Sequence, residues 1–174
     1  MNIPRHYVER LMEFGYTPPE AQFLYVVATH SEYFTLRQYL NFTGAHRGNR
    51  SSRFAHKILY NGHASVRDYM GYGSIYHLFS RTLCRQIEKG NLRNRRAHSF
   101  EFIRTRLVLL DFILANREAD YLETEPDKIN FFCEKLNIAK EFLPAKVYEG
   151  GTGSRPTIRY FVDKFPLRSS SNSQ

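Results

Sequence analysis

The sequence contains no tryptophan and only two cysteines, Cys84 and Cys133. Their separation matches neither a metal-ligand pattern nor a disulfide framework, so we expect two reduced thiols in a cytoplasmic protein. No apolar stretch reaches the roughly eighteen residues that a membrane span needs, and the first residues lack the apolar core of a secretory signal. These absences argue against a membrane protein and against a secreted disulfide scaffold.

Acidic residues are scarce in one long segment, residues 35–106. It holds 14 Lys and Arg but three acids (Asp68, Glu88 and Glu101), whereas the rest of the chain has 11 basic and 14 acidic side chains. Positive charge concentrated in this way favours a polyanionic partner, because Lys and Arg near phosphates release counterions. No helix here pairs a Lys-rich face with a broad apolar one, so we expect nucleic acid and no membrane as the partner.

The chain has enough apolar material for a folded core. Hydrophobic residues make up 42% of its 174 residues, with 14 Phe and 12 Tyr. A chain of this size forms one domain or two small ones.

Start signals and apolar periodicity predict a series of helices in the first half of the chain. Residues 4–14 carry a one-sided apolar pattern that stops at Gly15. Thr17-Pro-Pro-Glu20 and Thr35-Leu-Arg-Gln38 are capping boxes, which predict helices over about 17–31 and 35–43. A further helix is expected over about 49–61, ended by Gly62.

After Gly62 the pattern changes to the alternation of strands. Residues 64–69 and 74–78 alternate around Met70-Gly-Tyr-Gly73, which predicts a β-hairpin. Ser80 is the expected cap of a helix over 81–89. The order of helix, short helix, helix and hairpin between residues 17 and 79 is that of a winged helix-turn-helix, whose third helix enters the major groove of DNA.

The predicted helix over 49–61 has one apolar and one basic side. The apolar side contains Ser51, Phe54, Ala55, Ile58 and Leu59. The other side contains Asn49, Arg50, Arg53, His56, Lys57 and Tyr60. Such side chains bind base edges and phosphates, and no acid of this helix lies among them. We therefore expect this side to bind double-stranded DNA; the alternative is an ordinary solvated helix face.

Additional contacts with the DNA backbone are expected outside this helix. Two candidates near the hairpin tip are Arg67 and Tyr72, and three in the basic connector 91–98 are Arg93, Arg95 and Arg96. The alternatives are local packing for Tyr72 and a solvated linker for the three arginines.

The second half of the chain begins with a long predicted helix, from the Ser99 cap to about residue 116. Its apolar side favours homodimerisation, although packing within the chain explains it equally well. Residues 121–123, 146–148 and 157–162 are strand-like, and Thr124-Glu-Pro-Asp127 begins another helix.

The expected fold is α+β and mainly helical. We expect a winged-helix domain over 1–90, a basic connector over 91–98, a smaller α+β portion for dimerisation or partner binding over 99–168, and a disordered tail over 169–174.

Signals for catalysis are weak. The acidic run 118–127 includes Glu125 and Asp127, which could hold Mg²⁺ in a nuclease. However, no following strand presents an acid two residues before a lysine. The seven histidines form no metal pair, and the Gly-rich loop 150–156 lacks the Lys-Ser/Thr of a phosphate-binding loop. We expect no enzyme activity, no metal and no cofactor.

Residues 17–79 resemble winged-helix DNA-binding domains. The stretches Phe34-Thr-Leu-Arg-Gln-Tyr-Leu40, Arg53-Phe-Ala-His-Lys-Ile-Leu59 and Ser74-Ile-Tyr-His-Leu78 are similar to the N-terminal domains of replication-relaxation type proteins of bacterial plasmids and integrative elements. The resemblance implies a bacterial DNA-binding protein that regulates transcription or takes part in the replication or transfer of a mobile element. Two alternatives remain open: a protein-protein adaptor on a winged-helix scaffold, and an RNA-binding or nuclease-associated factor.

Overall fold

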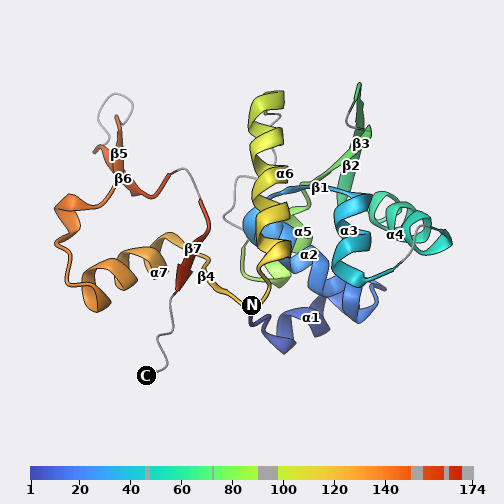
Figure 1. Cartoon of the computed structure of the whole chain (residues 1–174), viewed down its shortest axis with the longest axis horizontal. Coiled ribbons are helices and arrows are strands. Elements are labelled where there is room, and N and C mark those ends of the chain that lie inside the picture. The colour runs from blue at the N-terminus through green and yellow to red at the C-terminus, as the bar shows by residue number, and fades with distance from the viewer. Residues whose placement is uncertain (46–47, 72, 90–97, 150–154, 163–164, 170–174) are drawn as a thin grey trace. The chain divides into compact units, whose positions relative to one another are not determined.

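A computed structural model describes residues 1–45, 48–71, 73–89, 98–149, 155–162 and 165–169. These residues form two compact units, one of residues 2–117 and one that combines residue 1 with residues 118–174. The described residues form helices and small antiparallel sheets (Figure 1), so the expected α+β class is confirmed. No helix among them is long and apolar enough to cross a membrane.

The helices of the first unit begin where the sequence predicts. They are α1 (Arg5–Met12), α2 (Pro18–His30), α3 (Leu36–Thr43), α4 (Asn49–Tyr60), α5 (Arg81–Gln86) and α6 (Phe100–Ala115). Both capping boxes are present. The side chains of Glu20 and Gln38 accept hydrogen bonds from the backbone amides of Thr17 and Thr35. Ser80 and Ser99 cap α5 and α6 through their hydroxyls.

A three-stranded antiparallel sheet follows the order β1-β3-β2. Strands β2 (Ala64–Tyr69) and β3 (Gly73–Leu78) form the predicted hairpin. Gly71 and Gly73 have φ values of 81° and 72°, which favour glycine in this turn. Strand β1 (Tyr33–Thr35), between α2 and α3, pairs with β3 and was not expected.

The core of the first unit lies between α2, α3, α4 and one face of this sheet. Phe23 of α2 meets the rings of Phe34, Tyr39 and Phe54 at 5.3–6.0 Å, and Tyr39 stacks on Phe54 at 4.1 Å. All four rings are fully buried. Aromatic packing of this kind fixes the orientation of α4 against the two preceding helices.

Helix α6 belongs to the first unit, although the sequence placed it in a separate portion after the connector. Ile103 packs on the sheet against Tyr33, and Leu110, Ile113 and Leu114 are buried. The boundary between the compact units therefore lies after α6. The side of α6 that was expected to dimerise packs largely within the first unit. Val108 and Phe112 remain exposed on the other side of this helix.

Among its described residues, the second unit contains two small antiparallel sheets and one α-helix. Strand β4 (Asp120–Leu122) pairs with β7 (Leu167–Ser169), and β5 (Ala145–Tyr148) pairs with β6 (Thr157–Tyr160). Helix α7 (Glu125–Asn130) continues into a π-helical turn (Phe131–Lys135), and a 3-10 turn (Lys140–Phe142) follows. Ser169, expected in the disordered tail, lies in β7 and pairs with Asp120 of β4. The rest of the expected tail, residues 170–174, lies outside the described residues.

Candidate nucleic-acid interface

The apolar side of α4 is buried as its sequence predicts. Phe54 and Ile58 are fully buried, Ser51 and Ala55 are buried at the edges, and Leu59 is half-buried. The Ser51 hydroxyl donates to the carbonyl of Gly48 at 2.9 Å, which closes the first turn of α4. Burial of this side fixes which side chains α4 turns outward.

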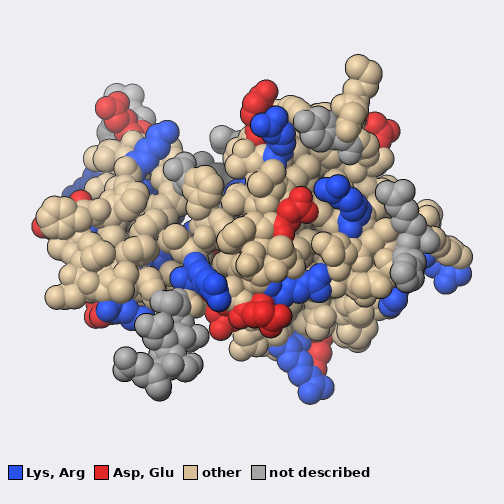
Figure 2. All heavy atoms as spheres, in the orientation of Figure 1, with Lys and Arg blue, Asp and Glu red and all other residues tan. Residues whose placement is uncertain are grey.

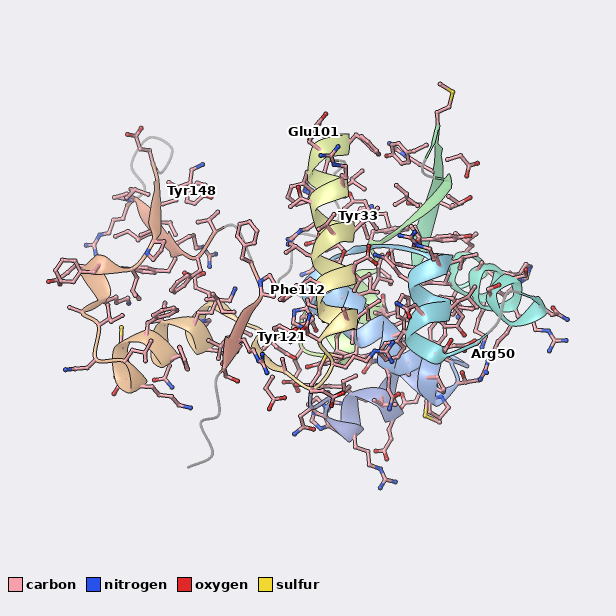
Figure 3. All side chains as sticks on the ribbon, viewed as in Figure 1. Tyr33, Arg50, Glu101, Phe112, Tyr121 and Tyr148 are labelled. Carbon is pink, nitrogen blue, oxygen red and sulfur yellow. The ribbon has the colours of Figure 1, made fainter. Side chains whose placement is uncertain are left out.

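The outer side of α4 presents an exposed polar and basic surface. Its members Asn49, Arg50, Arg53 and His56 are exposed, and Tyr60 is 83% exposed. Asn49, Arg53, His56 and Tyr60, with Ser52 and Lys57, line a shallow hollow. Figure 2 shows Lys and Arg atoms at the end of the first unit where α4 lies, and Arg50 is labelled in Figure 3.

Two rings on this surface are arranged for contact with a flat or charged partner. The imidazole of His56 and the ring of Tyr60 stack with centroids 6.0 Å apart and planes inclined by 12°. Because these residues are four apart, they lie above one another on the helix. Their ring nitrogens and hydroxyl supply donors and acceptors beside the guanidinium groups of Arg50 and Arg53.

Lys57 has a partner that the sequence pattern did not reveal. Its Nζ donates to the Glu20 carboxylate at 2.6 Å and to the Gly15 carbonyl at 2.9 Å, and it lies 5.6 Å from the centre of the Tyr16 ring. We expected a phosphate contact from Lys57. The structure pairs its charge with Glu20 of α2, so Lys57 fixes α4 to α2.

The end of α4 is tied to the same turn by two further contacts. The amide of Asn61 donates to the Phe14 carbonyl at 3.1 Å, and Tyr16 and His63 share a buried hydrogen bond of 2.8 Å. Burial raises the pKa of the Tyr16 phenol and lowers the pKa of the His63 imidazole. Both groups are therefore neutral near pH 7, and their hydrogen bond joins the segment before α2 to the turn after α4.

Of the other expected DNA contacts, the structure describes Arg67 alone. Arg67 lies on β2, exposed, and lines a cavity on the sheet face beneath α6. The remaining four expected contacts lie outside the residues that the structure describes: Tyr72, Arg93, Arg95 and Arg96. At the hairpin turn, Met70 is 99% exposed.

The carboxylates considered for a nuclease have structural partners. Asp127 accepts from the hydroxyl and backbone amide of Thr124 at 2.6 and 2.9 Å. Glu125 accepts from the amide of Tyr160 at 2.8 Å and pairs with Arg159 at 3.3 Å. Across the described ranges, no group of three His, Cys, Asp or Glu side chains is placed to hold a metal ion.

Comparison of the chain with family models, with curated proteins and with solved structures finds no match.

Proposed function

We propose that the first unit is a winged helix-turn-helix domain that binds double-stranded DNA. Support comes from the succession α2, β1, α3, α4, β2, β3 and from the sheet order β1-β3-β2. In such a domain the second helix of the pair enters the major groove, and the hairpin flanks the DNA backbone. Here α4 is that helix, and the β2–β3 hairpin is the wing.

The observation that carries the proposal is the exposed outer side of α4. Arg50 and Arg53 offer guanidinium forks suited to guanine edges or phosphates, and Asn49 offers an amide suited to adenine. The acid that pairs with Lys57, Glu20, is only 6% exposed at its side chain. Helix α4 has no carboxylate of its own, so a polyanion that approaches its outer side meets the guanidinium groups of Arg50 and Arg53.

The wing and the connector supply the expected backbone contacts in this proposal. Arg67 and Tyr72 belong to the wing, and Arg93, Arg95 and Arg96 follow in the segment 91–98. A role in transcription or in the replication or transfer of a mobile element would follow from such DNA binding.

A protein-protein adaptor is the second candidate. Exposed apolar side chains at Met70, Val108 and Phe112 favour it. Surface aromatic and aliphatic groups of this kind commonly mark protein contacts.

Salt titration of the full chain against random and genomic duplexes tests the proposal. DNA binding should weaken linearly in a logarithmic plot, with a slope of about −0.9 per phosphate neutralised. The Arg50→Ala/Arg53→Ala variant should give a shallower slope, whereas Arg5→Ala on α1 should match the unmodified chain. Weak binding without salt dependence would favour the adaptor.

A further inference from the structure

A cavity of about 200 Å³ lies on the face of the sheet that is turned away from the α2–α4 core. The strand register places Ser65, His77 and Tyr33 in one row across β2, β3 and β1. Arg67 and Ile75 form the next row. Because side chains alternate along a strand, these rows share one face, and α6 covers part of it through Ile103.

Aromatic rings held in fixed positions make up much of the cavity wall. Tyr33, which lies between α6 and the sheet (Figure 3), stacks on His77 at 4.4 Å with planes inclined by 9°. Its hydroxyl is 3.0 Å from Nδ1 of His98, which stacks in turn on Phe102. Tyr69 stacks on Phe100 at 5.0 Å. Rings fixed in this way present flat apolar surfaces along the cavity wall.

Arg67 gives the cavity its charge. Of the described residues that line it, Arg67 is the only Lys or Arg, and none is acidic. The neighbouring Asp68 turns to the other face of the strand and accepts from the Ser74 hydroxyl at 2.6 Å. Burial raises the pKa of the Tyr33 phenol in the cavity wall to about 12, and the positive charge of Arg67 opposes this rise.

We propose that this cavity binds a small aromatic carboxylate. The carboxylate would accept two parallel hydrogen bonds from the planar guanidinium of Arg67. A lysine ammonium, which is a point charge, cannot form this paired arrangement. The ring would lie against the Tyr33–His77 stack and Tyr69. Sites for drug-sized ligands usually measure about 300–1,000 Å³, so a cavity of this smaller size fits one ring with its acid group. The site is separate from the outer side of α4, but it shares Arg67 with the wing, where Arg67 is an expected contact of the DNA backbone.

Benzoate titrated into the full chain tests the proposal, with the methyl signals of Ile75 and Ile103 observed by NMR. Both residues line the cavity, and we expect their signals to shift and to saturate. Benzyl alcohol keeps the ring without the charge, and inorganic phosphate keeps the charge without the ring. Each should bind roughly tenfold or more weakly than benzoate, since a hydrogen bond to a charged group or a stacked ring is lost.

Substitutions of two residues that line the cavity, Ser65 and Arg67, test whether benzoate binds there. Arg67→Gln should weaken benzoate binding roughly tenfold or more, and Arg67→Lys, which keeps the charge but loses the fork, should fall between. Ser65→Phe should fill the cavity and abolish saturation. Arg81→Gln, on the exposed start of α5, is the matched control and should bind as the unmodified chain does.

Three results would overturn the proposal. The first is a benzoate response without saturation, and the second is equal binding of benzyl alcohol or phosphate. The third is unchanged affinity in an Arg67→Gln chain whose methyl spectrum shows an intact fold.

Discussion

The ammonium group of Lys57 on α4 lies 2.6 Å from the carboxylate of Glu20 on α2. The same carboxylate closes the capping box of α2 by accepting from the Thr17 amide at 2.8 Å. One nearly buried acid therefore holds the start of α2 and the last turn of α4 together. Lys57 is exposed only to 28% at its side chain, which places it at the foot of the proposed DNA-binding surface.

We predict that Lys57→Met lowers the free energy of unfolding by about 1–3 kcal/mol, because it leaves the Glu20 carboxylate without its cation. Urea unfolding measures this change. The Glu20→Gln/Lys57→Met double variant should lose less than the two single changes together, since the residues interact. A Lys57→Met chain of unchanged stability but strongly reduced DNA affinity would make Lys57 a DNA contact.

Arg53→Ala should have the opposite profile. We expect DNA binding to weaken by about 1–3 kcal/mol if Arg53 contacts a base, with the unfolding free energy changed by no more than about 0.5 kcal/mol because the side chain is exposed. Fluorescence anisotropy at one fixed salt concentration, with Arg5→Ala as control, measures the first effect. Unaltered binding in a folded Arg50→Ala/Arg53→Ala chain would refute the role given to α4.

Signals within a few residues of each other predicted the helices well. The boxes Thr17–Glu20 and Thr35–Gln38 depend on contacts three residues apart, which the sequence displays directly. Strands β1 and β7 were missed: each has three residues, too few to show a full alternating pattern, and the equally short β4 was predicted one residue away from its observed bounds.

Contacts between distant residues set the limits of the sequence argument. The helical wheel of α4 displays Lys57 on the basic side but contains nothing of Glu20, 37 positions earlier. The apolar side of α6 is plain in the sequence, yet its partners Tyr33 and Ile75 lie on strands about which that helix carries no information. The same holds for Arg67, whose place in a cavity depends on strand register.

A buried ion pair holds α6 to the turn between α2 and β1, and its loss should be severe. Arg106 and Glu32 have side chains only 4% and 5% exposed and approach to 3.9 Å. We predict that Arg106→Ala lowers the unfolding free energy by about 3–5 kcal/mol, since it leaves a buried carboxylate without its cation. Urea unfolding of Arg104→Ala, an exposed neighbour on α6, gives the control value of about 0.5 kcal/mol or less. Equal effects of the two substitutions would contradict this role.

Restoring neutrality gives a second measurement on the same pair. Glu32→Gln combined with Arg106→Met removes both charges, so it should lose less stability than Arg106→Ala alone. A double variant that is less stable than the single one would show that the charges are not the source of the effect.

Burial of His63, whose imidazole is hydrogen-bonded to Tyr16, makes stability depend on pH below neutrality. His63 is 5% exposed, and burial lowers its pKa from the ordinary value of 6.5. The unfolded chain therefore binds a proton at His63 more readily than the folded chain does. Its contribution to stability is complete well above pH 6.5 and decreases as the pH falls through 6.5 toward the lower folded pKa.

Urea unfolding between about pH 8 and pH 5 should show this loss, with His63 contributing at most about 1.4 kcal/mol per pH unit. His63→Gln should be less stable than the unmodified chain at the upper end, and the difference should shrink as the pH falls. His6→Gln, which changes a histidine at an exposed position of α1, should keep the original slope. If His63→Gln also kept that slope, protonation of the imidazole held by Tyr16 would not be what weakens the support of α4 in acid.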